Sequence, residues 1–304
     1  MIIETHALWG EEPVPDYPAT FTSYLADANP KAPGALRPAV IICGGGSFTH
    51  IAQHEQEPVA LEFLAHGYQA FVLDYVTKET GDPSFPNPEA DLAKMVARVR
   101  ANAAEWRIDP ARVCVVGFSA GAFACASLAA QWKEGLLSAA TGEAAASIRP
   151  DAVVLGYPLL DLRVTRDEQT RDPRIDLRVP KTGGKTGRDL LMEYLSLVAG
   201  GEATEERLQE ICPASHVSRA MPPTFIWATA DDKTCPVRQV YDFASALSAA
   251  GVVHELHVFA AGGHGLSVAN ASTRVEGIEE RQEAVAAWLP LAHAFLRRQG
   301  VEDA

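Results

Sequence analysis

The chain has 304 residues, 47% hydrophobic and 21% charged, a balance that is ordinary for a globular enzyme with a large buried core. Its formal net charge is −13 and no cluster of lysine or arginine offsets it, which excludes nucleic acid and anionic membranes as partners. The N-terminus has no basic region followed by an apolar one, and no run of about 18 apolar residues occurs, so we expect a soluble, cytoplasmic protein.

The cysteine pattern points away from disulfides and metal sites. The five cysteines are odd in number, scattered, and mostly inside apolar runs. Such residues are typical of reduced thiols in or near a core. We therefore expect no disulfide, no metal and no cofactor. The cysteines are Cys43, Cys114, Cys125, Cys212 and Cys235.

The first 36 residues or so predict a hairpin or meander at a sheet edge. Strands are expected around Ile2–Leu8 and near Thr20–Leu25, and proline-rich connections follow each of them. The prolines break any helix and suit an edge position. No residue in this part suggests a chemical role.

From residue 38 onward, apolar strands alternate with helices. Alternation in this order implies right-handed crossovers and a mostly parallel sheet of about eight strands, covered by helices on both faces. Strands are predicted at 38–43, 68–75, 113–118, 151–158, 222–229 and 253–259. Helices are predicted at about 57–67, from 89 to about 106, after residue 119 to about 128, around 240–247 and at about 277–298. Repeats and low-complexity segments are absent, so residues 1–304 are predicted to form a single α/β domain.

Residues 159–219 interrupt this rhythm. The segment 161–188 is charged and contains glycine, and helices are predicted only over 189–198 and near 204–211. An insertion of this size usually caps a site or supplies an interface, and a disordered surface excursion is the alternative.

The stretch Gly117-Phe-Ser119-Ala-Gly121 has the form of a nucleophile elbow. A β-branched apolar run precedes it and an Ala/Leu-rich run of helical character follows. At a tight strand-to-helix turn the serine hydroxyl is held clear of the sheet, and only small residues fit two positions to either side. The simpler alternative is a glycine-rich turn whose serine caps the helix.

Three further loops follow strands and carry residues suited to the same site. Gly44-Gly-Gly46 leaves backbone N–H groups bare, as an oxyanion hole requires, although a flexible loop would look the same. His264 lies on a glycine-flanked loop, and the pair Asp231-Asp232 follows the strand 222–229.

Ser119, one of the two aspartates and His264 follow in the order expected of a Gly-x-Ser-x-Gly hydrolase. The carboxyl ends of parallel strands share one edge of the sheet, so these groups are expected to converge there. A serine hydroxyl needs an imidazole to take its proton, and the imidazole needs a carboxylate to fix its tautomer. We prefer Asp232 as that carboxylate because it lies further out along its loop, and leave Asp231 as a helix cap or loop-binding residue.

At these residues the chain resembles the α/β-hydrolase superfamily, and within it the carboxylesterases that include acetyl-xylan-esterase-like and feruloyl-esterase-like proteins. The resemblance covers most of residues 38 to 265. The pieces that carry it are Cys43-Gly-Gly-Gly-Ser-Phe, Glu57-Pro-Val-Ala, Gly67-Tyr-Gln-Ala-Phe-Val-Leu-Asp-Tyr75, Ile108-Asp-Pro-Ala-Arg-Val-Cys-Val-Val-Gly-Phe-Ser-Ala-Gly121, Pro222-Pro-Thr-Phe-Ile-Trp-Ala-Thr-Ala-Asp-Asp232 and His254-Glu-Leu-His-Val-Phe-Ala-Ala-Gly-Gly-His-Gly265.

The resemblance implies a role for each of these residues. Ser119 would be the nucleophile, His264 the base and Asp232 the orienting acid. The N–H groups of Gly45, Gly46 and Ala120 would form the oxyanion hole. Two departures stand out: Cys43 replaces the histidine of many relatives, and Ala122-Phe123 replaces their Gly-His after the elbow.

The sequence therefore predicts a serine esterase that acts on small acyl esters through an acyl-enzyme, with acetylated sugars or xylo-oligosaccharides as the expected substrates. The expected partner is a small ester substrate, and a homo-oligomer is left open. One alternative is an amidase or peptidase with the same triad, which would use arginines of the insertion to bind a charged terminus. These are Arg163, Arg166, Arg171, Arg174 and Arg178. The other alternative is a binding protein on a disabled hydrolase fold.

Overall fold

The computed structural model describes residues 1–10, 18–171, 185–274, 276–277 and 279–303. Its centre is an eight-stranded sheet in the order β1-β2-β4-β3-β5-β6-β7-β8. The strands are β1 (Ile2–Ala7), β2 (Thr20–Leu25), β3 (Arg37–Cys43), β4 (Gln69–Asp74), β5 (Ile108–Phe118), β6 (Ala152–Gly156), β7 (Thr224–Thr229) and β8 (His254–Phe259). Strands β3 to β8 pair in parallel, and β1 and β2 add an antiparallel edge. The mostly parallel sheet is confirmed.

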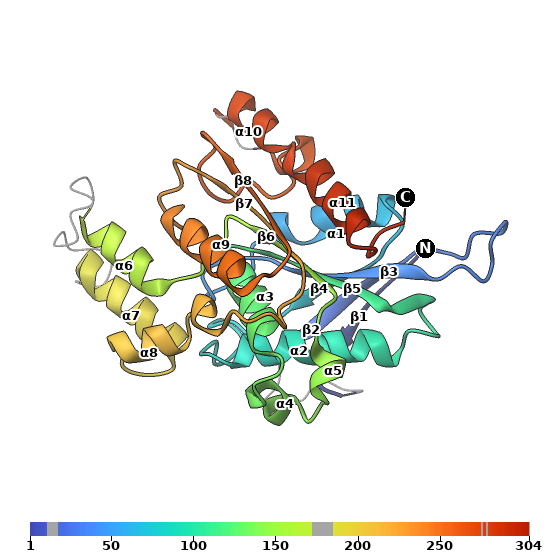
Figure 1. Ribbon diagram of the computed structural model, residues 1–304, viewed down its shortest axis with the longest axis horizontal. Coiled ribbons are helices and arrows are strands. Elements are labelled where there is room, and N and C mark those ends of the chain that lie inside the picture. The colour runs from blue at the N-terminus through green and yellow to red at the C-terminus, as the bar shows by residue number, and fades with distance from the viewer. Residues whose placement is uncertain (11–17, 172–184, 275, 278, 304) are drawn as a thin grey trace.

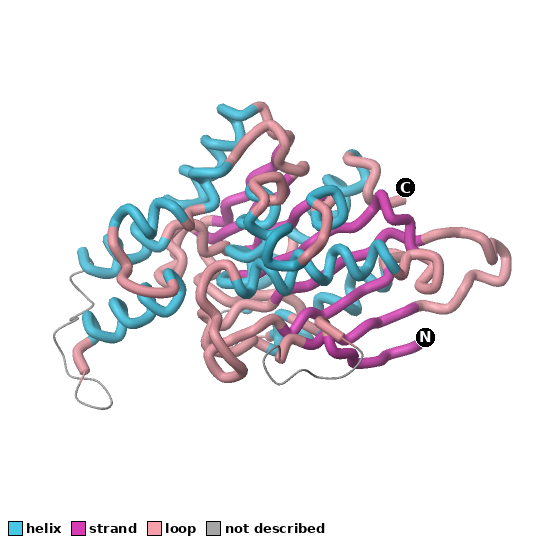
Figure 2. Tube along the Cα trace, turned by 90° about the horizontal axis from the view of Figure 1, so that it is seen from below, coloured by secondary structure: helices cyan, strands magenta, loops and turns pink. Residues whose placement is uncertain are grey.

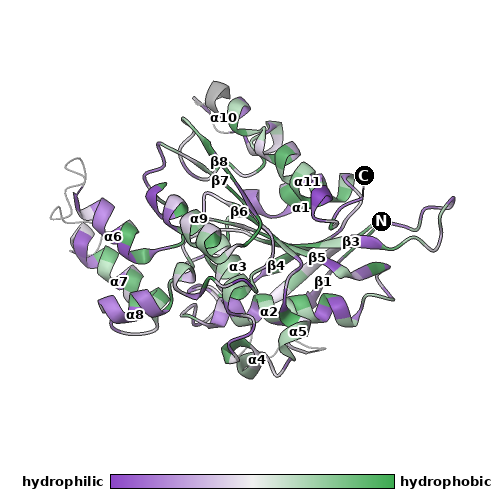
Figure 3. Cartoon of the chain, in the orientation of Figure 1, coloured by the Kyte–Doolittle hydropathy of each residue, from purple (hydrophilic) through white to green (hydrophobic). Residues whose placement is uncertain are grey.

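The central strands read as unbroken apolar runs because both faces of the sheet are buried. In β3, Ile41 and Cys43 point into one core, whereas Val40 and Ile42 point into the other. Helices α2 (Asn87–Ala101), α3 (Ser119–Gln131) and α9 (Arg238–Ala250) bury their apolar faces in the first core. Helices α1 (Glu57–Ala65), α10 (Glu279–Val285) and α11 (Trp288–Arg298) contribute to the second (Figure 1). Figure 3 shows the hydrophobic residues concentrated in the sheet and on the helix faces that cover it.

Between β6 and β7 the chain leaves the sheet and forms α6 (Leu162–Arg171), α7 (Gly187–Ala199) and α8 (Glu205–Glu210). These three helices lie together at one end of the molecule, away from the two termini (Figure 1 and Figure 2). Below we call them the cap. A capping box between Thr186 and Asp189 begins α7.

Helix α6 was not predicted from the sequence, where the first helix expected within residues 159–219 begins at 189. The helix is almost entirely polar, and only Leu162 and Thr165 of it are buried. It is held by contacts outside its own sequence, including an ion pair of 3.0 Å between Arg166 Nη1 and Glu205 Oε2 of α8. The rest of the stretch, 172–184, lies outside the described residues.

Two smaller boundaries also differ from the expectation. The helix predicted over 89–106 ends at Ala101, and Asp109-Pro110 lies inside β5, where a shift in register between β3 and β5 accommodates it. The helix predicted over 277–298 is divided into α10 and α11. The break falls before Pro290, which has no N–H to bond the carbonyl four residues back. Shorter helices α4 (Leu136–Thr141) and α5 (Ala145–Ile148) occupy the small-residue stretch after α3.

Candidate active site

Ser119 stands at the junction of β5 and α3 in a strained conformation. Its φ is +50°, in the left-handed region that non-glycine residues rarely adopt, and it is only 7% exposed. The neighbouring loop passes so close that a Cβ on Gly121 would lie 2.2 Å from the carbonyl oxygen of Cys43. The strand-turn-helix context expected of a nucleophile elbow is therefore present.

Ser119, His264 and Asp232 form one hydrogen-bonded chain. The distance from Ser119 Oγ to His264 Nε2 is 2.9 Å, and that from His264 Nδ1 to Asp232 Oδ2 is 2.7 Å. Since the carboxylate only accepts, Nδ1 carries the proton and Nε2 is left to accept from the serine hydroxyl. The Asp232 side chain is fully buried, whereas that of His264 is 20% exposed. Residues expected at one sheet edge thus meet there.

Both aspartates of the pair have defined and different partners. Asp232 Oδ1 accepts from the N–H groups of Thr234 (2.8 Å) and Cys235 (2.9 Å), which fixes the carboxylate with Oδ2 toward the histidine. Asp231 Oδ1 instead accepts from the N–H groups of Gly262 and Gly263, at 2.9 Å each.

Although partial burial acts to raise the pKa of Asp231, these two N–H groups hold it below its ordinary value. Asp231 therefore binds the backbone of the loop that carries His264, and the orienting contact belongs to Asp232.

The glycine loop lies directly beside the serine, and its amides are not equivalent. The Gly45 N–H, expected in the oxyanion hole, donates to Glu55 Oε2 at 2.6 Å and is already engaged. Gly46 has a φ of +121°, and a Cβ there would lie 2.2 Å from the His50 carbonyl oxygen, so only glycine fits. Ala120 lies in the first turn of α3, where backbone N–H groups lack an intrahelical partner.

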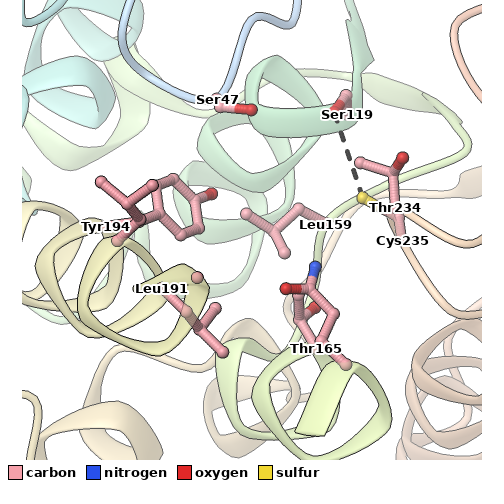
Figure 4. A pocket seen from close by; sticks show the side chains of 11 residues that line it. Ser47, Ser119, Leu159, Thr165, Leu191, Tyr194, Thr234 and Cys235 are labelled. Carbon is pink, nitrogen blue, oxygen red and sulfur yellow. Dashed lines mark hydrogen bonds between the residues drawn. The ribbon is translucent and has the colours of Figure 1, made fainter. Parts of the chain in front are cut away.

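A cavity of about 290 Å³ opens beside Ser119 (Figure 4). Residues after β6 and β7 form one side of it and the cap helices α6 and α7 the other. Its lining is mixed, with Ser47, Ser119, Thr165, Gln169 and Thr234 among the polar residues and Leu159, Leu190, Leu191, Tyr194 and Cys235 among the less polar ones. The insertion therefore contributes to the site, which is a role the sequence left open.

Cys235 is a site residue that the sequence analysis did not identify. Its Sγ lies 4.0 Å from Ser119 Oγ, and the residue is 3% exposed. Burial raises the pKa of this thiol well above its ordinary value, so the sulfur stays protonated. All five cysteines are free and buried, as expected.

In the described part of the chain, no three side chains of His, Cys, Asp or Glu gather in a way that could hold a metal ion. Within the same residues, no helix has the length and apolar character needed to cross a bilayer.

Comparison with known proteins identifies the family of the chain. Residues 27–247 match the family model described as BD-FAE. The endo-1,4-beta-xylanase B of Butyrivibrio fibrisolvens is 32% identical over 235 residues, which make up 77% of this chain and 33% of that relative. The chain thus spans about a third of the length of that protein.

Solved structures are similar to this chain over nearly its whole length. The acetyl ester-xyloside bifunctional hydrolase of Caldicellulosiruptor lactoaceticus is 27% identical, with a TM-score of 0.71 and coverage of 95% of this chain and 96% of that one. A putative carboxylesterase of Lactobacillus plantarum is 30% identical, with a TM-score of 0.67 and coverage of 96% and 98%. The carboxylesterase Cest-2923 of that organism shares the fold over the full length of both chains, with a TM-score of 0.78 at 24% identity. The chain belongs to the BD-FAE family, a family of α/β-hydrolase carboxylesterases.

Proposed function

We propose that this carboxylesterase hydrolyses short-chain acyl esters, acetyl esters first among them, through an acyl-enzyme on Ser119. The observation that carries the proposal is the hydrogen-bonded chain from Ser119 through His264 to Asp232, at 2.9 and 2.7 Å, beside a cavity that the serine lines. A serine hydroxyl is a weak nucleophile at neutral pH, and an adjacent base that is itself oriented by an acid activates it.

The proposed steps follow from these contacts. Ser119 Oγ attacks the acyl carbon while its proton passes to His264 Nε2, and the buried Asp232 stabilises the imidazolium that forms. His264 then donates the proton to the leaving alcohol oxygen, which releases the alcohol and leaves the acyl group on the serine. A water molecule then gives a proton to His264 Nε2 as its oxygen attacks the acyl carbon, and His264 returns that proton to Ser119 Oγ as the carboxylic acid is released.

The tetrahedral oxyanion is assigned to the amides of Gly46 and Ala120. The Gly45 amide, expected beside them, already donates to Glu55 and is left out of the hole in this proposal. The Ala120 N–H lies in the first turn of α3, so the positive end of the helix dipole also stabilises the oxyanion.

A short acyl group suits the space beside the serine. The cavity of about 290 Å³ is narrowed by Leu159, Cys235 and the cap residues Leu191 and Tyr194. The names of two relatives, a xylanase and an acetyl ester-xyloside hydrolase, support a carbohydrate as the alcohol part. Acetylated xylo-oligosaccharides are accordingly the substrates we propose first.

Among the residues that the structure describes, no contact favours the amidase alternative. In the cap, Arg163 is paired with Asp161 at 2.7 Å, and Arg166 with Glu205 at 3.0 Å, so these two guanidinium groups already have carboxylate partners. Arg171 lies 3.6 Å from Asp167, and positions 174 and 178 fall outside the described residues.

The test compares wild type with Ser119→Ala on p-nitrophenyl acetate, butyrate and octanoate, and then on acetylated xylo-oligosaccharides. Loss of the nucleophile is expected to lower kcat by about 10⁴-fold or more. The specificity constant is expected to fall with acyl length. Equal rates for the two proteins, or failure of a fluorophosphonate to label Ser119, would instead favour a non-catalytic binding protein.

A further inference from the structure

Glu55 is a buried carboxylate that lies between the two loops of the site. It is 2% exposed and follows the glycine loop by a few residues, in a 3-10 helix at Gln53–Glu55. Its Oε2 accepts from the Gly45 N–H at 2.6 Å, and its Oε1 accepts from the Tyr157 hydroxyl at 2.5 Å. A buried carboxylate is costly unless such donors satisfy it, and these two hydrogen bonds satisfy one oxygen each, with His54 Nε2 a further 3.7 Å from Oε1.

The first contact orients the glycine loop. In a trans peptide unit the C=O and the following N–H point in opposite directions. The unit joining Gly44 and Gly45 is held at both ends, because the Tyr75 hydroxyl donates to Gly44 O (2.6 Å) while Glu55 accepts from the Gly45 N–H.

The next peptide unit is held through its carbonyl, since Gly45 O accepts from the Ala52 N–H at 2.9 Å. The Gly46 N–H of that same unit consequently points away from Ala52. The hydrogen bond from the Gly45 N–H to Glu55 fixes the position of the residue from which this peptide unit starts.

The second contact orients the histidine loop. The Tyr157 ring packs edge-on against the His264 imidazole, with centroids 4.9 Å apart and planes at 65°. Its oxygen accepts from the Ser267 N–H at 2.9 Å, three residues beyond the histidine. Burial raises the pKa of Tyr157, so the phenol stays protonated and donates to Glu55. Tyr157 also has a φ of +34°, an uncommon conformation that places it between β6 and the site.

We propose that Glu55 is a positioning residue that sets the oxyanion-hole amide of Gly46 and the base His264 relative to each other. It touches neither of these groups directly and acts through Gly45 on one side and Tyr157 on the other. This inference rests on the proposed esterase function. Because the alignment matters most where charge develops in the transition state, Glu55 acts on kcat more than on KM.

A matched pair elsewhere in the fold separates this role from the general importance of a buried carboxylate. Glu302 is 6% exposed and accepts from the Tyr68 hydroxyl at 3.1 Å and from His293 Nδ1 at 2.5 Å. Tyr68 immediately precedes β4, so this pair lies at the amino ends of the parallel strands, opposite the site. Tyr68→Phe removes a tyrosine donor to a buried carboxylate away from the site, and Glu302→Gln removes that carboxylate's charge, which also breaks its ion pair with Arg297 Nη1 at 2.5 Å.

The experiment measures kcat and KM on p-nitrophenyl acetate, together with the melting temperature and the Ki of a short alkyl boronic acid, which forms a tetrahedral adduct on the serine. Glu55→Ala is expected to lower kcat by about 10²-fold, at the lower end of the loss from removing one oxyanion donor. Glu55→Gln, which keeps one acceptor oxygen, and Tyr157→Phe are each expected to lower it about tenfold. In each of these variants KM is expected to stay within about threefold of the wild-type value. The Ki of the boronic acid is expected to rise by about the same factor as kcat falls.

The double variant Glu55→Ala/Tyr157→Phe is expected to be little worse than Glu55→Ala, because both substitutions break one linkage. If Glu55→Ala does not fold, Glu55→Gln and Tyr157→Phe carry the same test. The inference is overturned if these variants keep wild-type kcat, or if the Glu302 and Tyr68 controls lose as much kcat for the same drop in melting temperature.

The two hypotheses fail in distinguishable ways. Wild-type protein without activity that depends on Ser119 contradicts the proposed function. Activity that depends on Ser119 but is unaffected by changes at Glu55 and Tyr157 contradicts only the positioning role.

Discussion

Replacing Asp232 by asparagine should disable the site while leaving its shape intact. The N–H groups of Thr234 and Cys235 both donate to Oδ1, so the amide oxygen of asparagine takes that place and the NH₂ group takes the place of Oδ2. That NH₂ then faces His264 Nδ1 across the present 2.7 Å and can only donate to it. The imidazole is forced into the tautomer with its proton on Nε2, where it cannot accept the proton of Ser119.

The loss expected from the wrong tautomer is about 10⁴-fold in kcat, which corresponds to about 5.5 kcal/mol in the activation free energy. The assay is kcat on p-nitrophenyl acetate at neutral pH, with the melting temperature as a check on folding. Asp231→Asn is the matched control, since its oxygen can still accept from Gly262 and Gly263, and it should stay within about tenfold of wild type. A larger loss for Asp231→Asn than for Asp232→Asn would refute the assignment of the acid.

Three further predictions concern other parts of the chain. Gly46→Ala should lower kcat by about 10²-fold or prevent folding, because the Cβ would lie 2.2 Å from the His50 carbonyl oxygen, and activity together with circular dichroism distinguishes the two. Burial raises the pKa of Glu89 from an ordinary 4.5 to about 8. Between pH 4.5 and 8 the folded state therefore binds more protons than the unfolded state, and the free energy of unfolding falls as the pH rises toward 8. Urea unfolding at pH 5, 6.5 and 8 should show wild type losing up to about 1.4 kcal/mol per pH unit relative to Glu89→Gln, and parallel curves would contradict this. The native protein should not react with a thiol reagent over minutes, whereas after denaturation five thiols should titrate, because every cysteine is buried and free.

The proximity of Ser119 and His264 could be predicted from the sequence, because each residue follows a parallel strand and the carboxyl ends of such strands lie at one edge of the sheet. It did not distinguish the roles of Asp231 and Asp232 with certainty, since neighbouring residues on one loop differ only in the direction of their side chains. That direction depends on which backbone N–H groups donate to each carboxylate. The donors to Asp232 lie on its own loop, and those to Asp231 lie on the loop that carries His264.

Other features depended on contacts between distant segments. Nothing in the sequence marks Glu55 as a site residue beyond its place before a predicted helix. The positioning role proposed for it depends on its hydrogen bonds with Gly45 and Tyr157, which form only in the folded chain. Helix α6 lacks an apolar stripe and is held by its neighbours in the cap. The division of the last helix, in contrast, was visible in Pro290, which the helical periodicity outweighed.

The proposed function depends on transfer of the acyl group to Ser119, and trapping the acyl-enzyme tests whether this transfer occurs. Protein mixed with p-nitrophenyl acetate is quenched in acid within its first turnover, digested, and analysed by mass spectrometry. We expect one acetyl group on Ser119 in wild type, a greater amount in a variant slowed in deacylation, and none at this position in Ser119→Ala. Full hydrolytic activity in Ser119→Ala, or an acetyl group found on another side chain in wild type, would contradict this expectation.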